Sequence, residues 1–180
     1  PAPATAIVGG EDAKKGEFPF MASIQRAGSS GSDGQICGGS VVGKRWILTA
    51  AHCTVFSKKQ VQVVVGRTDL TAKGGQVLRV SRFAVHPDYD DTGSSDVALW
   101  RTKKRIKAPR IALPKAADDA LETAGTVLTV AGWGVESSGG SEAPENLKKV
   151  DVSVSSDLEC ITNLLLGFNA DTEFCASELG

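Results

Sequence analysis

The most informative stretch of the chain is Trp46-Ile47-Leu48-Thr49-Ala50-Ala51-His52-Cys53. The small apolar residues from Ile47 to Ala51 are typical of the end of a strand, and His52 follows at once. Cys53 can tie this loop back to Cys37, and a general base needs such a support because its imidazole must be held in one position. A histidine beside a cysteine is also compatible with plain packing. The pinned loop makes His52 a candidate general base.

Asp96 is the second candidate, because it stands in front of the four apolar residues Val97-Ala98-Leu99-Trp100. This pattern draws the carboxylate toward the interior, where an unpaired charge is costly. The Nδ1–H of a histidine would satisfy the carboxylate and would also fix the useful tautomer of the ring. The alternative is that Asp96 only caps a strand after the turn at 93–95.

Composition excludes several classes of protein. The chain has 180 residues, of which 41% are apolar and 23% charged, as in ordinary globular proteins and unlike disordered chains. No apolar run approaches the length of about 18 residues that a membrane helix needs. A net charge of −1 gives no reason to expect nucleic acid or an anionic membrane as a partner. The basic run Lys103-Lys104-Arg105, with Lys107, indicates a solvated connector, and a binding patch is the alternative.

The four cysteines fall into two close pairs. Cys37 and Cys53 are 16 residues apart, and Cys160 and Cys175 are 15 residues apart. Four cysteines allow three connectivities. Pairing of near neighbours would close two loops, each worth about 3 kcal/mol in the chain-entropy model. Disulfides indicate an oxidising compartment, so we expect a secreted, extracellular protein.

The chain is dominated by short β-branched and apolar runs, which occur at 62–65, 77–80, 126–130 and 150–154. Glycine-rich turns separate these runs, a pattern that favours an all-β sandwich or barrel. A domain joint is expected near 103–120, which is rich in Lys, Ala and Pro.

One segment departs from the β pattern. Ser156 and Glu159 match a capping box, in which a serine begins a helix and a glutamate three residues later binds back. The apolar residues that follow at helical spacing are Leu158, Ile161, Leu164 and Leu165. We therefore expect one short helix near 156–166, which Gly167 can end.

Seven motifs give the chain a family resemblance, and they occur in the order of that family. They are Ile7-Val8-Gly9-Gly10, Gly16-Glu17-Phe18-Pro19-Phe20, Cys37-Gly38-Gly39-Ser40, Trp46 to Cys53, Asp96-Val97-Ala98-Leu99, Val130-Ala131-Gly132-Trp133-Gly134 and Phe174-Cys175-Ala176. The sequence resembles a trypsin-like (chymotrypsin-fold) serine protease, and within that family it is most similar to microbial and fungal trypsins.

The resemblance implies two antiparallel six-stranded β-barrels with the active site between them. Residues 7–115 would form the first barrel, residues 116–180 an incomplete second barrel, and residues 1–6 a propeptide-like tail. His52 would be the general base, and Asp96 would be the carboxylate that orients it.

The resemblance also implies the disulfide pairs Cys37–Cys53 and Cys160–Cys175. No cofactor and no metal is expected, because the only acid between Gly66 and Gln76 is Asp69 and this leaves too few oxygen ligands for Ca²⁺.

The family's Gly-Asp-Ser-Gly-Gly segment does not occur in these 180 residues. By analogy its serine nucleophile would follow about 10 residues beyond the last residue. We therefore expect a fragment of a secreted serine endopeptidase that cleaves after Arg or Lys, inactive as it stands. The alternative is a catalytically inactive homologue that acts as a binding protein. The expected partners are protein or peptide substrates and protein protease inhibitors, with no nucleic acid and no membrane, and the full-length protein would be a monomer.

The amino end predicts a zymogen. In the family, activation frees an amine that corresponds to that of Ile7. Here Ala6 precedes Ile7 in place of Arg or Lys, so removal of the tail by an Ala-tolerant protease or by dipeptide trimming is expected in place of autolysis. Pro3 argues against trimming.

Overall fold

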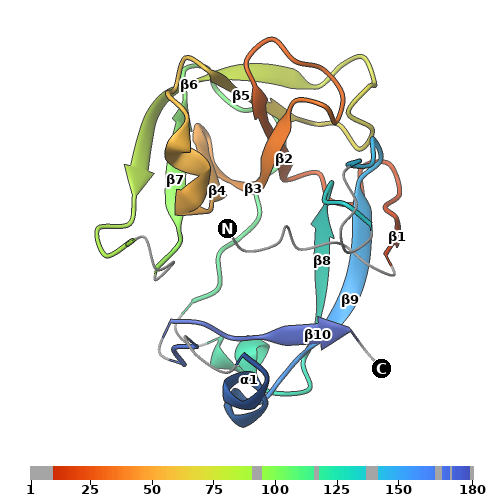
Figure 1. Cartoon of the computed structure of the whole chain (residues 1–180). Coiled ribbons are helices and arrows are strands. Elements are labelled where there is room, and N and C mark those ends of the chain that lie inside the picture. The colour runs from red at the N-terminus through yellow and green to blue at the C-terminus, as the bar shows by residue number, and fades with distance from the viewer. Residues whose placement is uncertain are drawn as a thin grey trace.

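The computed structural model describes residues 10–90, 95–115, 118–136, 142–164, 168–170 and 172–178. Figure 1 shows a barrel of strands above a second, smaller sheet. The strands of the barrel are β2 (Met21–Arg26), β3 (Gln35–Gly43), β4 (Trp46–Thr49), β5 (Val61–Val65), β6 (Gln76–Val85) and β7 (Ala98–Thr102). They close in the order β2-β3-β4-β7-β6-β5, with every neighbouring pair antiparallel.

Alternating side chains fill the barrel. In β7 the side chains of Ala98, Trp100 and Thr102 are buried, and the residues between them are exposed. This alternation is the period of a strand with one face toward a core. Trp100 packs on Phe83, with 4.4 Å between the ring centroids, and is fully buried together with Ile24 and Ile47. A closed barrel with its own core gives a rigid support to any residue at the ends of its strands.

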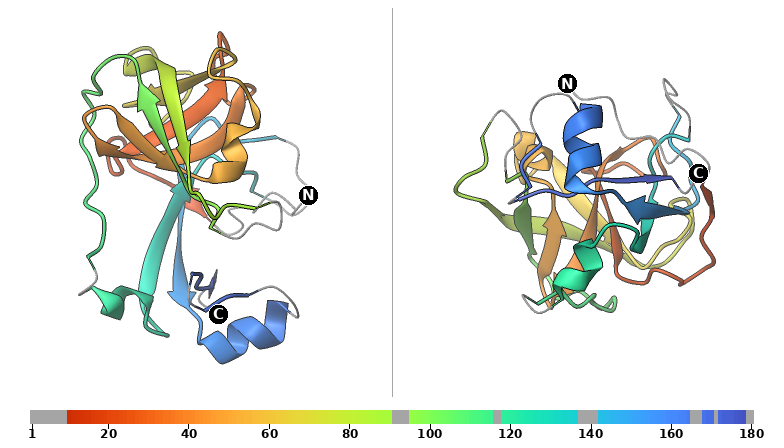
Figure 2. Two further views of the ribbon diagram at one scale, coloured as in Figure 1. Left: turned by 90° about the vertical axis from the view of Figure 1, so that its left-hand side faces the viewer. Right: turned by 90° about the horizontal axis from the view of Figure 1, so that it is seen from below.

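The second sheet is built on β9 (Lys148–Val154). One edge of β9 pairs with β8 (Val127–Gly132), and the other edge pairs with β1 (Glu11–Asp12) and β10 (Ala176–Glu178). Figure 2 shows this sheet extending away from the barrel, with the chain after β7 running down one side. The expected all-β fold with antiparallel barrels is confirmed for the closed first barrel and the second sheet, and the boundary of the two domains stays a prediction.

The capping box is present as predicted. The amide of Glu159 donates to Ser156 Oγ at 3.3 Å, and the amide of Ser156 donates to Glu159 Oε2 at 2.8 Å. Helix α1 runs over Asp157–Leu164, so the prediction of one helix near 156–166 is confirmed within the described residues, and Leu165 and Gly167 lie outside them. Two short 3-10 helices, η1 (Ala51–Val55) and η2 (Asp119–Glu122), were not predicted.

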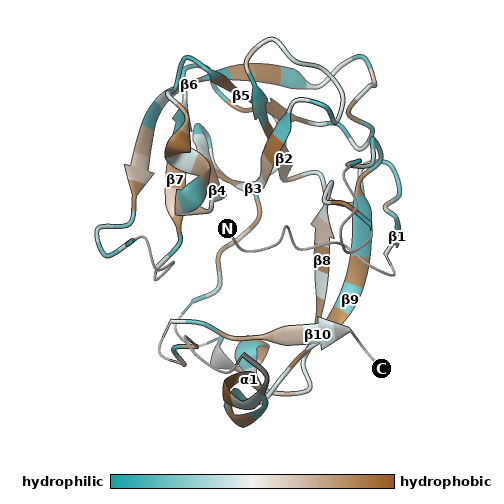
Figure 3. Ribbon diagram, in the orientation of Figure 1, coloured by the Kyte–Doolittle hydropathy of each residue, from teal (hydrophilic) through white to brown (hydrophobic). Residues whose placement is uncertain are grey.

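The apolar positions of α1 are less buried than their spacing indicates. Leu158 is 74% exposed and Ile161 is 57% exposed, because the described part of the chain places no layer against this side of the helix. Figure 3 shows hydrophobic residues along α1, far from the barrel. No helix among the described residues combines the length and apolar character needed to cross a bilayer.

Candidate active site

The pairing of β4 with β7 brings the two candidate residues together. In this antiparallel pair Thr49, the last residue of β4, lies opposite Ala98, the first residue of β7. His52 follows β4 on η1, and Asp96 comes just before β7. Residues 44 positions apart in the sequence therefore meet at one end of the barrel.

Asp96 holds His52 at two points. Its Oδ2 lies 2.6 Å from Nδ1 of the ring, and its Oδ1 accepts a hydrogen bond of 2.8 Å from the backbone N–H of His52. The carboxylate thus fixes both the position of the backbone and the orientation of the imidazole. Since an ionised carboxylate only accepts hydrogen bonds, Nδ1 carries the proton, and in the neutral ring Nε2 is left with a free lone pair.

Helix η1 is fastened on both sides of the histidine. Cys53 forms a disulfide with Cys37 of β3, and the hydroxyl of Thr54 donates to the carbonyl of Ala51 at 2.6 Å. The side chains of Ala51 and Cys53 are buried, and that of His52 between them points outward. The ring is therefore presented to solvent from a short segment that is itself fixed.

The motif Cys37-Gly38-Gly39-Ser40 has a packing reason at its second glycine. A Cβ on Gly39 would lie 2.8 Å from Ile47 Cγ2 and 2.8 Å from the carbonyl oxygen of Leu48. Such a distance is too short for a carbon atom, so only glycine allows β3 and β4 to approach this closely. A Cβ on Gly38 would meet no atom within 4 Å.

The electrostatics of the pair favour an ionised carboxylate. Partial burial raises the pKa of Asp96, but hydrogen bonds from the His52 ring and from the backbone outweigh this effect, and the net pKa of Asp96 is lowered from 3.8. The apolar residues after Asp96 predict a buried carboxylate, but the side chain of Asp96 is 31% exposed. The side chain of His52 is 62% exposed, so a reacting group can reach Nε2 from solvent.

One part of the site gave no sequence signal. Ser95, directly before Asp96, has a φ of +52°. Within the described part of the chain, all other residues with positive φ are glycines. The amide of Val97 donates to the carbonyl of Ser95 at 2.6 Å, which closes a tight turn around Asp96. This left-handed residue aims the carboxylate at η1. The turn residues at 93–95 indicated a change of direction but not its geometry.

Among the described residues, the group found beside Nε2 is a disulfide sulfur, which has no proton to give. The Sγ of Cys37 lies 4.0 Å away, and no hydroxyl of the described chain bonds to Nε2. Cys37, His52 and Cys53 lie close enough to suggest a metal site, but both sulfurs are engaged in the disulfide and neither is a thiolate, which is the form that binds metals. These residues therefore do not fit a metal.

The remaining candidates of the sequence lie elsewhere. Ile7 falls outside the described residues. The structure pairs Cys160 with Cys175, which links α1 to the segment before β10. Asp69 accepts hydrogen bonds from the amide and the hydroxyl of Thr71, at 2.7 and 2.6 Å, so its carboxylate is used within its own turn.

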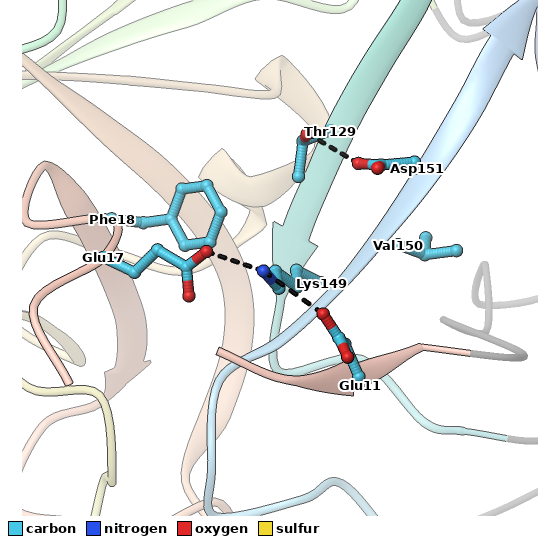
Figure 4. A pocket seen from close by; sticks show the side chains of 7 residues that line it. All are labelled: Glu11, Glu17, Phe18, Thr129, Lys149, Val150 and Asp151. Atoms are coloured by element: carbon cyan, nitrogen blue, oxygen red, sulfur yellow. Dashed lines mark hydrogen bonds and ion pairs between the residues drawn. The ribbon is translucent and has the colours of Figure 1, made fainter. Parts of the chain in front are cut away.

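A separate cavity of about 490 Å³ lies where β1 meets β8 and β9 (Figure 4). Its central cation, Lys149, is neutralised by Glu17 at 2.6 Å and by Glu11 at 3.2 Å. Neither His52 nor Asp96 lines it. The cavity is therefore a feature of the second sheet and of the loop before β2, and not of the His52–Asp96 site.

Comparison with known proteins agrees with this geometry. The family model described as Trypsin matches residues 7–179. A trypsin of Saccharopolyspora erythraea is 40% identical over 157 residues, covering 86% of this chain and 66% of the relative. Trypsin 5G1 of Aedes aegypti is 36% identical over 160 residues, covering 86% of this chain and 57% of the relative.

A solved structure, that of the VesB protease of Vibrio cholerae, superposes with a TM-score of 0.84 at 30% identity, covering 97% of this chain and 53% of that one. The chain thus spans about two-thirds or less of the length of these relatives. The barrel, the His52–Asp96 contact and these matches lead to one conclusion: the chain belongs to the trypsin family.

Proposed function

We propose that the protein is a serine endopeptidase in which His52 is the general base and Asp96 orients it. The observation that carries this proposal is the 2.6 Å contact between His52 Nδ1 and Asp96 Oδ2, with Nε2 open to solvent. A pure binding module on this scaffold has no use for an ionised carboxylate locked onto an exposed imidazole. The attacking serine belongs to the family's Gly-Asp-Ser-Gly-Gly segment, which these 180 residues do not include.

The chemistry follows from the free lone pair of Nε2. The serine oxygen attacks the peptide carbonyl carbon while its proton passes to Nε2, and Asp96 stabilises the imidazolium that forms. The C–N bond then breaks, and Nε2 returns the proton to the departing amine. Water hydrolyses the acyl-enzyme by the same route in reverse. In both halves His52 moves the proton, and the carboxylate remains ionised.

We further propose that cleavage takes place after Arg or Lys. The support is the family resemblance and the two relatives that carry the name trypsin. Two disulfides fit an extracellular protein, and we propose secretion as a zymogen whose activation frees the amine of Ile7. Amino-terminal sequencing of active secreted protein would show Ile7 first, and an active form that begins at Pro1 would contradict this activation step.

The test is made on protein expressed from the complete coding sequence. Turnover is measured on matched peptide anilides with Arg, Lys or Phe before the scissile bond, together with covalent labelling by a fluorophosphonate, which reacts with activated serines. We expect labelling and a kcat/KM for Arg and Lys at least about 100-fold above that for Phe. Labelling with a preference for Phe would overturn the specificity alone. Absence of both labelling and turnover in folded protein would favour the binding homologue.

A further inference from the structure

Basic and acidic residues are unevenly distributed along the chain, although its net charge is only −1. Residues 44–110 contain 14 Lys or Arg and 5 Asp or Glu, a net charge of +9. The rest of the chain contains 6 basic and 16 acidic residues, a net charge of −10. The basic segment carries β4 to β7, so the positive charge is concentrated on the first barrel. A field of one sign attracts ligands of the opposite sign.

Part of this charge lines a concavity of about 290 Å³ on the outside of the barrel. Its lining residues are Lys58, Lys59, Arg79, Val80, Ser81 and Lys103. We call its four cations, Lys58, Lys59, Arg79 and Lys103, the basic cluster. No acidic side chain lines the concavity.

Three segments of the fold build the basic cluster. Lys58 and Lys59 stand at the tip of the turn from Ser57 to Gln60, which the hydrogen bond from the Gln60 amide to the Ser57 carbonyl closes at 2.9 Å. The Gln60 side chain accepts a second bond of 3.0 Å from the Ser57 amide. The turn therefore presents two lysines from a fixed backbone.

The other two cations come from β6 and from the chain after β7. The amide of Lys103 donates to the carbonyl of Arg79 at 2.8 Å, which places these two residues side by side. Ser81 is fastened to the same edge, because its hydroxyl donates to the carbonyl of Arg101 at 2.9 Å. Lys103 of the run at 103–107 thus contributes to a basic surface, which is the alternative that the sequence left open for a run expected to be a solvated connector.

The charges of the basic cluster are not compensated within the described residues. All four side chains are exposed, and the ion pairs of the described chain involve only Lys148, Lys149 and His52 as cations. Lys148, by contrast, binds Asp12 and Glu136, at 3.0 and 2.8 Å. Positive side chains on the second sheet are therefore neutralised by the protein, and those of the basic cluster are not.

Two further arginines on the same strands add to this positive charge. Arg82 of β6 lies directly opposite Arg101 of β7 in the ladder, and both side chains are exposed. Like charges that face each other across a ladder destabilise a sheet. Arg82 shares β6 with Arg79, and Arg101 comes two residues before Lys103, and all four side chains are exposed on the closed barrel. An anion bound beside these side chains would reduce the repulsion between them.

The lining residues indicate the class of this anion. Val80 is only 1% exposed, and no aromatic side chain lines the concavity, so the site offers charge and hydroxyl groups without an apolar anchor. Nucleic acid strands that bind without base pairing gain from stacking on aromatic rings, which this surface lacks. We propose that the basic cluster, together with Arg82 and Arg101, binds a sulfated polysaccharide. This site uses neither His52 nor Asp96 and does not depend on the proposed hydrolysis.

The test measures binding of fluorescently labelled heparin to protein expressed from the complete coding sequence, over a series of NaCl concentrations. The variants are Lys58→Gln with Lys59→Gln, and Arg79→Gln with Lys103→Gln. The matched control is Lys14→Gln with Lys15→Gln, which removes two exposed lysines outside the basic segment. Unchanged melting temperatures show that all variants fold.

We expect each double variant in the basic cluster to weaken heparin binding by about tenfold or more and to lower the slope of log K against log salt by about two, one for each lost ion contact. The control pair stays within about twofold of the parent. Equal weakening by the control and the cluster variants would overturn the proposal, since the binding would then depend on net charge alone. Equal affinity for desulfated heparin, or for a single-stranded DNA of the same length, would overturn the assignment to sulfated polysaccharide.

Discussion

At the scale of single residues, the site depends on one carboxylate that binds one histidine twice. Asp96 accepts from the ring and from the backbone of His52, so it sets both the tautomer and the place of the imidazole. Its lowered pKa means that this pairing is present at every pH above 3.8 and is lost only in stronger acid, as the pH falls through the lowered value.

Replacement of Asp96 by Asn tests this orienting role. An amide can donate to Nδ1 and so hold the wrong tautomer, in which Nε2 carries the proton and cannot accept one. We expect Asp96→Asn in the complete enzyme to lower kcat by about four orders of magnitude with little change in melting temperature. The matched control is Asp88→Asn, an exposed aspartate on the turn at 86–89, which should leave kcat unchanged. A loss of less than about tenfold for Asp96→Asn would contradict the role.

At the scale of elements, the site depends on how closely β3, β4 and β7 pack. Gly39 lets β3 and β4 approach, and β4 carries the chain directly into η1. A widened β3–β4 contact would move the end of β4 and with it the backbone of His52. The position of the His52 backbone thus depends on a glycine that lies outside the His52–Asp96 pair.

Gly39→Ala and Gly38→Ala form a matched pair. A Cβ at Gly39 meets Ile47 and the Leu48 carbonyl at 2.8 Å, and a Cβ at Gly38 meets nothing within 4 Å. We expect Gly39→Ala to lower the free energy of unfolding by about 1–3 kcal/mol, as overpacked cores do, and Gly38→Ala to change it by less than about 0.5 kcal/mol. Urea denaturation measures both. Equal effects at the two positions would show that the close approach is not what requires glycine.

The elements also show what the sequence could predict. Local patterns found the strands at 62–65 and 150–154 and the capping box of α1, because alternation and capping depend on neighbouring residues. The register that sets Thr49 opposite Ala98 and the left-handed Ser95 could not be predicted, because they depend on long-range pairing and on a turn geometry that several sequences share. The cost of an unpaired carboxylate indicated a histidine as the partner of Asp96, and the family resemblance identified that histidine as His52.

At the scale of the whole molecule, the two halves are linked by polar contacts around a small core. The indole N–H of Trp133 donates to the carbonyl of Thr68 at 3.0 Å, and Glu145 accepts from the amide and the hydroxyl of Ser32, both at 2.9 Å. Lys149 adds its ion pairs with Glu17 and Glu11. The second half is therefore held to the barrel side by hydrogen bonds and charges as well as by apolar packing.

This arrangement predicts a pH dependence of stability. The hydrogen bond with Glu17, followed by that with Glu11, raises the pKa of Lys149 above 10.5, and the bond from Lys149 lowers the pKa of Glu17 below 4.5. A raised lysine pKa stabilises the fold below pH 10.5 and stops doing so as the pH rises through the raised value. A lowered glutamate pKa stabilises the fold above pH 4.5, and this stabilisation is lost as the pH falls through the lowered pKa. The pair stabilises the fold between these limits.

We expect Lys149→Gln to lower the melting temperature at pH 7 by no more than about 3 °C, and by progressively less below pH 4.5. Lys73→Gln is the control, because Lys73 is exposed and in no ion pair of the described chain. Thermal denaturation followed by circular dichroism from pH 2 to pH 8 makes the comparison. A difference from wild type that persists unchanged at pH 2 would show that Lys149 acts by packing and not by charge.

The central claim is that His52 moves the proton, and the chain provides its own control, because its other histidine, His86, lies in a turn where its Nδ1 accepts from the amide of Asp88 at 3.3 Å. The direct measurement is kcat of the complete enzyme with His52→Ala and, separately, with His86→Gln. The account predicts that His52→Ala lowers kcat by about five to six orders of magnitude, while His86→Gln stays within about twofold of wild type. Well-folded His52→Ala enzyme that keeps more than about a tenth of the wild-type kcat would contradict it.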